Sequence, residues 1–349
     1  MKASLRTVRL ALAEPLRISR STMSARDAVW LTVEHDGVTG HGEAVTSVYY
    51  GLGTAALERL LTAAGTALAR FPDPESALYD GEPTAAGTPP AVTAAVEAAL
   101  LDLVGKRAGR PVHRLLGTAE PPAAATARTI GITAPADAAA QARRLAASGF
   151  QVLKVKAGAV DPEEDVERVR VIRDAAPRAR LLLDPNGAWT VPQAEALLPR
   201  YAEIGVEAVE QPLAPGTPEA LGALAERSPL PVIADEDAMD LEDVRRLAGR
   251  VQGVNVKLAK CGGARSALRI ASLLHGSGTD LMLGCLTASS LGLAPAVHLA
   301  DRARWTDLDG HLLLAHDPWT GIGGQDGVVR TNGLPGLGVV EVEAYEDVA

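Results

Sequence analysis

The second part of the chain alternates short apolar runs with longer amphipathic segments. From Ala127 onward, runs rich in leucine or β-branched residues alternate with stretches rich in alanine, arginine and glutamate. Such runs are typical of buried parallel strands, and the longer segments of helices that cover a sheet. Strands are predicted at 127–132, 151–156, 180–184, 206–210, 231–235, 253–257, 280–284 and 304–308. Their starts recur about every 25 residues, and eight such units predict an α/β fold, a (β/α)8-type barrel or modified TIM barrel.

The first part of the chain has a different pattern, which predicts a capping domain of α+β type. Segments 29–33 and 39–44 are predicted to form a hairpin that turns at 35–37. Two alanine- and leucine-rich helices follow near 54–70 and 88–107, joined by a loop that contains glycine and proline.

Three further segments bear on how the cap meets the barrel. The polar segments 19–25 and 47–53 are predicted as loops that cover a site formed elsewhere. Residues 338–342 predict a strand that the barrel does not need, and we expect it to return to the capping domain. The predicted division is a capping part at 1–122, a barrel at 123–324 and a C-terminal tail at 325–349 that returns to the cap.

Composition narrows the class of protein. Of 349 residues, 47% are hydrophobic and 22% charged, as expected for a globular chain with a sizeable core. The net charge of −9 argues against nucleic acid or an anionic membrane as a partner. The start of the chain does not predict a signal peptide, and no apolar run reaches the length of a membrane span. Cys261 and Cys285 are too few for a disulfide framework, so we expect a cytoplasmic protein with buried, unreactive thiols.

Charged side chains stand at the ends of the predicted strands, where the loops of a barrel build active sites. Lys154 and Lys156 end the second strand on one face of it, because alternate residues of a strand point the same way. A solvent-facing edge strand is the alternative explanation for such a pair. The other strand-end residues are Asp184, Glu210, Asp235, Glu236, Lys257, Asp307 and Asp309, with Asn186 close behind Asp184. A single acidic residue there is usually a helix cap, but carboxylates ending three consecutive strands, with lysines on either side, favour an active site.

The carboxylates of the third, fourth and fifth strands would converge on one point. Three such groups cannot all stay ionised at close range without a cation, and oxygen ligands from separate strands suit Mg²⁺ or Mn²⁺. Lysines on both sides of the barrel mouth would face a bound ligand from opposite directions. Because burial and a neighbouring like charge both disfavour ionisation, Lys154 would push Lys156 toward the neutral amine. This arrangement predicts removal of a proton next to a carboxylate.

With these motifs the sequence resembles the enolase superfamily, specifically its muconate-lactonising-enzyme subgroup. The matching motifs are Lys154-Val-Lys156, Asp184-Pro-Asn186, Glu210-Gln-Pro, Asp235-Glu236 and Val254-Asn-Val-Lys257-Leu-Ala-Lys-Cys-Gly-Gly263, and the resemblance covers nearly the whole chain. Sites of that superfamily combine a Lys or His base with one or two Mg²⁺ ions. The resemblance implies that Asp184, Glu210 and Asp235 bind Mg²⁺, with one ion per subunit and Mn²⁺ as the alternative. It also implies that Lys156 and Lys257 are the two acid/base groups.

The resemblance also implies supporting roles. Lys154 would lower the pKa of the neighbouring catalytic lysine and stabilise the enediolate. Asn186 and Glu236 would support the ligands from behind, and a purely structural role for each is the alternative. Lys260, three residues past Lys257, is the alternative acid/base, although Lys257 is the residue that closes the strand.

Within the subgroup, Asp307-Leu-Asp309 resembles the D-x-D signature of the dipeptide epimerases, whose carboxylates bind the substrate's α-ammonium group. The spacing turns both carboxylates to one face of a strand, which suits a free amine. A solvated aspartate pair is the alternative. Thr129, Thr287 and Arg20 are further candidate substrate contacts by the same resemblance.

We therefore predict a Mg²⁺-dependent dipeptide epimerase, an isomerase that performs 1,1-proton transfer at the α-carbon of the second residue of an L,L-dipeptide. The alternatives are a muconate cycloisomerase, an N-acylamino-acid racemase, an o-succinylbenzoate synthase or a non-catalytic ligand-binding barrel. Ala288 replaces a glutamate of the subgroup, and Ser21 stands where enzymes that prefer Ala-Glu place an arginine. The sequence therefore does not favour glutamate as the second residue. Resembling proteins associate through their capping domains, which predicts a homo-oligomer.

Overall fold

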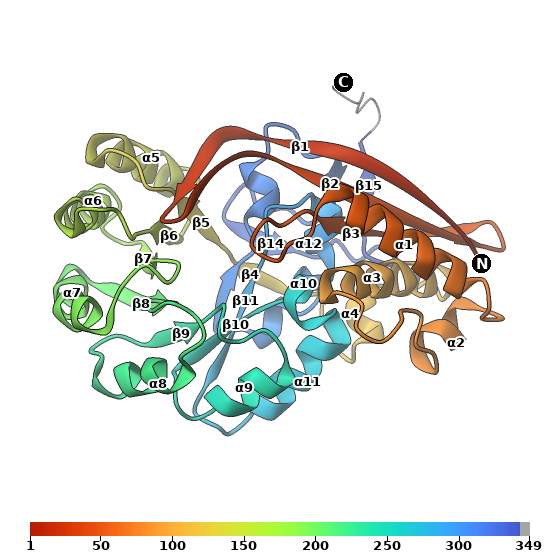
Figure 1. Ribbon diagram of the computed structural model, residues 1–349. Helices are drawn as coiled ribbons and strands as arrows, with labels where there is room; N and C mark the ends of the chain where they lie inside the picture. Colours follow the sequence, from red (N-terminus) through yellow and green to blue (C-terminus); the bar gives the residue numbers. More distant parts are fainter. Residues whose placement is uncertain (343–349) are drawn as a thin grey trace.

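An eight-stranded parallel sheet curls into a barrel in the structure, a computed structural model that describes residues 1–342 (Figure 1). Its strand order follows the chain. The strands are β5 (Ala127–Ile130), β6 (Val152–Lys156), β7 (Arg180–Asp184), β8 (Val206–Glu210), β9 (Val232–Ala234), β10 (Gly253–Lys257), β11 (Asp280–Gly284) and β12 (Trp305–Asp307). All eight lie within two residues of the predicted strands at each end, and the predicted fold class is confirmed.

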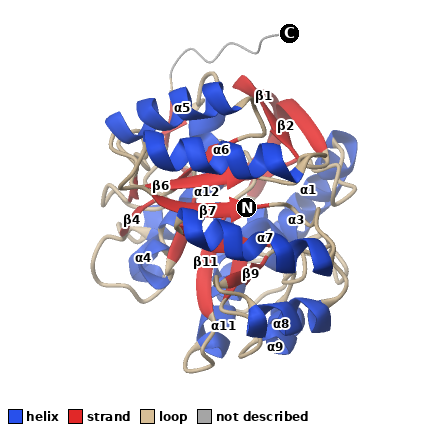
Figure 2. Cartoon of the chain, turned by 90° about the vertical axis from the view of Figure 1, so that its left-hand side faces the viewer, coloured by secondary structure: helices blue, strands red, loops and turns tan. Residues whose placement is uncertain are grey.

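Helices cover the outside of this barrel, and Figure 2 shows α5, α6 and α7 outside β6 and β7. They are α5 (Pro135–Ala147), α6 (Pro162–Ala175), α7 (Val191–Ile204), α8 (Pro218–Arg227), α9 (Leu241–Leu247), α11 (Ala264–Leu274) and α12 (Ser290–Val297), while the short helix α10 (Leu258–Cys261) lies at the end of β10 against α3 (Pro90–Arg107) of the cap. Local sequence sets their ends: Thr190 and Gln193 form a capping box at the start of α7, and Gly205 ends that helix with φ at 85°. Within residues 1–342, the helices are all too short or too polar to span a bilayer.

The barrel interior has two layers, because alternate residues of each strand point inward. The lower layer is apolar and consists of Ala127, Val152, Leu182, Ala208, Ile233, Met282 and Trp305. Trp305 fills the centre, and a Cβ at Gly253 would lie 2.7 Å from its ring. One step further along the same strands, the inward residues become charged. The interior is therefore a dry base beneath a polar layer at the C-terminal mouth.

Side chains, rather than a ladder, hold the first and last barrel strands together. In the described part of the chain, β5 and β12 do not share backbone pairing. Instead the Leu308 amide donates to Thr126 Oγ1 at 2.8 Å, and the Thr129 amide donates to Asp309 Oδ2 at 2.7 Å. Asp309 thus helps to close the barrel.

The capping domain begins with an antiparallel sheet of β1 (Lys2–Ile18), β2 (Ser21–His35) and β3 (Val38–Val45), against which α1 (Thr54–Leu68) and α3 (Pro90–Arg107) pack. The short helix α2 (Pro74–Tyr79) packs against α3. Figure 1 shows the β1–β2 hairpin extending from these helices across to the barrel. The predicted loop at 19–25 is wrong, because only residues 19–20 form the turn and Ser21 pairs with Ile18. Backbone pairing makes a strand of this polar segment in spite of its composition.

The C-terminal tail pairs with two segments and also touches the cap. The pairs are β14 (Val328–Arg330) with β4 (Ala123–Ala125), and β15 (Val340–Glu341) with β13 (Trp319–Thr320). The Leu337 amide donates to Asp102 Oδ1 of α3 at 2.8 Å, and the amide of Val112, in the short helix α4 (Val112–Leu115), donates to the Gly336 carbonyl. Residues 343–349 of the predicted tail lie outside the described residues, and the predicted domain boundaries stay predictions.

Candidate active site

Three carboxylates end consecutive strands at the polar layer. Asp184, Glu210 and Asp235 close or follow β7, β8 and β9, and each is at most 1% exposed. Burial raises the pKa of Glu210 to about 7, and the charge of Asp184 adds to this effect. Burial also opposes ionisation of Asp184, but Lys156 and Lys154 outweigh it and lower its pKa to about 2. These groups need positive charge nearby in order to ionise together.

Lysine ammonium groups supply that charge in the structure. Lys154 Nζ lies 2.6 Å from Glu210 and 3.1 Å from Asp184, while Lys156 Nζ lies 2.5 Å from Asp184. Lys257 Nζ lies 2.7 Å from Asp235. Among residues 1–342, the acidic, His and Cys side chains do not form a ready-made metal cage. The oxygen-only donor set with cations already against it nevertheless fits a hard divalent ion.

Lys154 and Lys156 lie on one face of β6, as predicted, yet their like charges are screened by Asp184 between them. Burial disfavours the Lys154 ammonium, but Asp307, Glu210 and Asp184 together raise its pKa well above the ordinary value. Lys154 is therefore a fixed cation. The predicted effect of Lys154 on the pKa of Lys156 stays a prediction.

The structure separates the two candidates for the second acid/base group. Lys257, at the end of β10, lines the cleft at the barrel mouth. Lys260 is 1% exposed, and its Nζ donates to the carbonyl and carboxylate of Asp235 at 2.6 Å and to the Asn255 carbonyl at 2.8 Å. These bonds satisfy all three of its N–H donors, so Lys260 holds the β9 loop in place and Lys257 is the group that a ligand can reach.

The end of β6 is fixed from behind by a buried ion pair on α6. Arg168 pairs with Asp165 and also donates to the Lys156 carbonyl at 3.1 Å. Asp165 accepts hydrogen bonds from the amides of Gly158 and Ala159. The loop that follows Lys156 therefore has little freedom to move.

Asp307 and Asp309 both line the cleft but differ in their partners. Asp307 Oδ2 accepts a 2.8 Å hydrogen bond from Lys154, and burial raises the pKa of Asp307. Asp309 accepts from the Thr129 amide, and Arg128 Nη1 lies 3.3 Å from it. The alternative of a solvated pair is wrong, because the two residues are 5% and 3% exposed.

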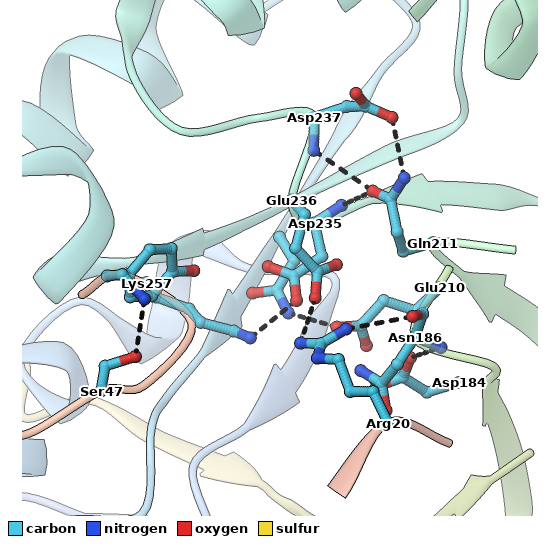
Figure 3. A network of polar contacts seen from close by, with 12 residues as sticks. Arg20, Ser47, Asp184, Asn186, Glu210, Gln211, Asp235, Glu236, Asp237 and Lys257 are labelled. Atoms are coloured by element: carbon cyan, nitrogen blue, oxygen red, sulfur yellow. Dashed lines mark hydrogen bonds and ion pairs between the residues drawn. The ribbon is translucent and has the colours of Figure 1, made fainter. Parts of the chain in front are cut away.

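Arg20 joins the hairpin tip to two loops of the barrel, as Figure 3 shows. Its Nη2 donates to Glu236 at 2.7 Å, its Nη1 donates to the Asn186 carbonyl at 3.0 Å, and its guanidinium stacks on Tyr49. Asn186 in turn donates from its backbone and side chain to Asp184. Arg20, predicted as a substrate contact, lines the cleft while it ties the cap to the barrel.

Two residues beside the carboxylates hold left-handed backbone conformations that side chains seldom adopt. Asn186 has φ at 52° and Gln211 has φ at 39°. Gln211 is fully buried, accepts from the amides of Asp235 and Asp237, and donates to the Asp237 carboxylate (Figure 3). It therefore fixes the loop that carries Asp235.

The cleft wall is completed after β11. Cys285 and Thr287 line it, while Ala288 is buried beside it. Cys285 and Cys261 are half-buried rather than fully buried, and burial raises the pKa of the Cys261 thiol to about 11. Burial likewise raises the pKa of Cys285, so both thiols stay protonated at neutral pH.

Sequence reasoning missed three residues that shape the site. Asn255 donates to Glu210 at 2.8 Å, and its inward position two residues before Lys257 was the available signal. Gln211 follows a strand-end carboxylate, but it is uncharged, so the pattern of charged residues at strand ends does not include it. Arg26 lines the cleft from β2, and its alternation with the buried Ala28 was a usable signal.

The fold and these side chains define a capped barrel with two lysines above buried carboxylates. Residues 1–117 match the family described as "Mandelate racemase / muconate lactonizing enzyme, N-terminal domain". Residues 137–344 match the family described as "Enolase C-terminal domain-like". The chain belongs to this family, and the predicted membership is confirmed.

Particular relatives narrow the comparison. The chain is 32% identical over 347 residues to the L-Ala-D/L-Glu epimerase of Bacteroides thetaiotaomicron, covering 98% of this chain and 88% of the relative. It is 33% identical over 343 residues to the hydrophobic dipeptide epimerase of Roseobacter litoralis, with 97% and 99% covered. The solved dipeptide epimerase of Enterococcus faecalis V583, complexed with Mg and the dipeptide L-Leu-L-Tyr, has a TM-score of 0.91 at 29% identity, with 97% and 99% covered.

Proposed function

We propose that this protein is a Mg²⁺-dependent dipeptide epimerase that inverts the α-carbon of the second residue. The observation that carries the proposal is that Lys156 and Lys257 open onto one cleft from β6 and β10, above three buried carboxylates. The relatives named above are dipeptide epimerases. The proposal applies the same reaction class to this chain.

The metal ligands in this proposal are Asp184, Glu210 and Asp235, with one Mg²⁺ per subunit and Mn²⁺ as the alternative ion. Support comes from their burial, their all-oxygen donors and the lysine cations against them. When bound, the ion supplies positive charge that stabilises the anion formed by loss of the α-proton. Asn186, Asn255 and Gln211 orient the three carboxylates.

Lys156 and Lys257 exchange the proton in this mechanism. Their strands lie four apart in an eight-stranded barrel, so the two side chains approach the α-carbon from opposite sides. A neutral amine on one side takes the proton, and the electron pair of the broken C–H bond moves into the carboxylate to form an enediolate. The ammonium on the other side then donates a proton to the α-carbon and inverts it. Lys154, a fixed cation, adds stabilisation to the enediolate.

The substrate's amino group is assigned to Asp307 and Asp309. Both are buried acidic groups that line the same cleft, and Thr129 lies beside Asp309 through its amide. A free ammonium group would add a further counter-charge and hydrogen-bond donors for these buried acids, which already contact Lys154 and Arg128, whereas an N-acylated substrate would not. This difference separates a dipeptide epimerase from an N-acylamino-acid racemase.

Proton NMR in D₂O with Mg²⁺ and a set of L,L-dipeptides tests the proposal. We expect the α-proton signal of the second residue to disappear and the L,D-epimer to appear, while N-acetylated dipeptides react poorly. Lys156→Ala and Lys257→Ala should each lower the rate of α-proton exchange from one epimer by about 10²- to 10⁴-fold. Full turnover by either variant, or preference for N-acetylated substrates, would exclude the proposed reaction. The predicted homo-oligomer and cytoplasmic location stay predictions.

A further inference from the structure

Arg26 is a basic side chain of the cleft wall that has no acidic partner in residues 1–342. It lies on β2 opposite Leu10 of β1, and it shares a strand face with Ala28 and Trp30. Trp30 packs edge-on against Trp319, so this face of the cap turns toward the barrel. The position directs the guanidinium into the space between cap and barrel mouth.

The hydrogen bonding of this guanidinium is incomplete. Arg26 Nη2 contacts the Met23 sulfur at 3.4 Å, and a thioether is a weak acceptor. Arg26 Nη1 is buried and has no hydrogen-bond partner among the described residues. Burial lowers the pKa of Arg26. Arg26 is half-buried, and its buried Nη1 without a counter-charge is costly and calls for an anion.

The other basic residues of the cleft wall are all compensated within the described residues. Arg20 pairs with Glu236, and the lysines of β6 and β10 pair with carboxylates at 2.5 to 2.8 Å. The positive charge on Arg26 is therefore left for a ligand. The contact that the guanidinium does make, with the thioether of Met23, is not a competing anion.

We propose that Arg26 is a specificity residue that binds the side-chain carboxylate of a glutamate or aspartate at the second position of the dipeptide. The inference rests on the proposed function, in which the terminal carboxylate is taken by the barrel carboxylates and their metal. The first residue lies beside Asp307 and Asp309, which repel a further acidic side chain. An acidic second residue thus meets a cation in the cap and no carboxylate that needs to be displaced.

This specificity differs from the sequence-based expectation. Ser21 stands where enzymes that prefer Ala-Glu place an arginine, and this serine argued against glutamate. The structure supplies a guanidinium from another position, five residues further along β2, and directs it to the same cleft. An arginine fork can bind a carboxylate through two N–H donors, a stronger contact than a neutral amide would receive.

The test compares L-Ala-L-Glu with its uncharged isostere L-Ala-L-Gln, and with L-Ala-L-Leu and L-Glu-L-Ala. In the wild-type enzyme we expect kcat/KM for Ala-Glu to exceed that for Ala-Gln by about 10- to 100-fold. Arg26→Met should remove most of that factor from Ala-Glu while Ala-Gln stays within about threefold. Arg26→Lys keeps the charge without the fork and should keep part of the preference. Arg70→Met, an exposed arginine of the cap, is the matched control and should change neither substrate.

The outcomes separate the inference from the function on which it rests. Exchange with Ala-Leu and Ala-Gln but no preference for Ala-Glu would overturn the role of Arg26 and leave the epimerase intact. An equal loss for Ala-Glu and Ala-Gln in Arg26→Met would make the residue structural. A preference for Glu-Ala would place the acidic group on the wrong residue. No exchange with any dipeptide would instead refute the proposed function. If Arg26→Met does not fold, two measurements still test the role of Arg26. They are the wild-type ratio of kcat/KM for Ala-Glu to that for Ala-Gln, and the same ratio in Arg26→Lys; a ratio near one in the wild type would overturn the role.

Discussion

Glu43 makes the docking of cap and barrel sensitive to pH. It lies on β3 of the cap, and its carboxylate accepts hydrogen bonds from Trp30 Nε1 at 2.7 Å and from the amide and hydroxyl of Ser289 at 2.9 and 2.5 Å. Ser289 caps α12 of the barrel domain. Burial raises the pKa of Glu43 from 4.5 to about 7, against these hydrogen bonds, and Asp317 adds to the rise.

The sign and size of the effect follow from proton linkage. Between pH 4.5 and 7 the folded protein holds a proton on Glu43 that the unfolded chain has released. The contribution to stability is therefore fully present below pH 4.5 and is lost as the pH rises through 7. At about 1.4 kcal/mol per pH unit, the free energy of unfolding falls by about 3 kcal/mol across that range.

Urea unfolding from pH 4.5 to 8 measures this term in the wild type and in Glu43→Gln. We expect the difference in free energy of unfolding, wild type minus variant, to fall by about 3 kcal/mol as the pH rises. Glu219→Gln, at an exposed position on α8, is the control and should follow the wild type throughout. A difference that stays constant with pH, or one that grows, would refute the assignment of the titration to Glu43.

The remaining predictions concern parts that hold the site together. Arg168→Met leaves Asp165 buried without its cation, so we expect the free energy of unfolding, measured by urea titration, to fall by about 3 to 5 kcal/mol. The double variant Arg168→Met/Asp165→Leu should recover part of this lost free energy. Gly284→Ala places a Cβ 2.3 Å from Asn255 Oδ1, so we expect the free energy of unfolding to fall by about 1 to 3 kcal/mol and kcat to fall with it. An unchanged kcat would show that the close packing of Gly284 against Asn255 does not matter for the reaction. Exhaustive dialysis against EDTA should abolish α-proton exchange, and Mg²⁺ should restore it; exchange that persists in metal-free enzyme would argue against a metal role.

The barrel could be predicted because its signals are local. Most strands are short runs rich in leucine or β-branched residues, and a residue that ends such a run, such as Asp184 or Lys257, points into the mouth by strand geometry alone. The same rule predicts that the lysines and the three carboxylates meet at one end of the barrel. Alternation along a strand determines which residues point inward, and closure of the barrel brings the inward residues of all the strands together.

The cap could not be predicted to the same depth because its structure depends on contacts between segments that sequence composition does not reveal, within the cap and between cap and barrel. Ser21 and its polar neighbours have the composition of a loop, yet pairing with β1 makes them a strand. Arg20 was expected to meet the substrate, and its partner Glu236 is more than two hundred residues away in the chain. Sequence spacing says nothing about such contacts, since they depend on how the hairpin is laid across the mouth.

The division between barrel and cap also separates chemistry from selectivity. Lys156 and Lys257 are carried by barrel strands, whose positions are fixed on both sides by neighbouring strands. Arg26 and Met23 are carried by the β1–β2 hairpin of the cap, which is attached to the barrel through Arg20 and, by way of Trp30, through Glu43 of β3. A substitution at Arg26 can therefore change which side chain binds without displacing the groups that move the proton. For this reason the ratio between two substrates, rather than the rate with either one, is the quantity that reports on Arg26.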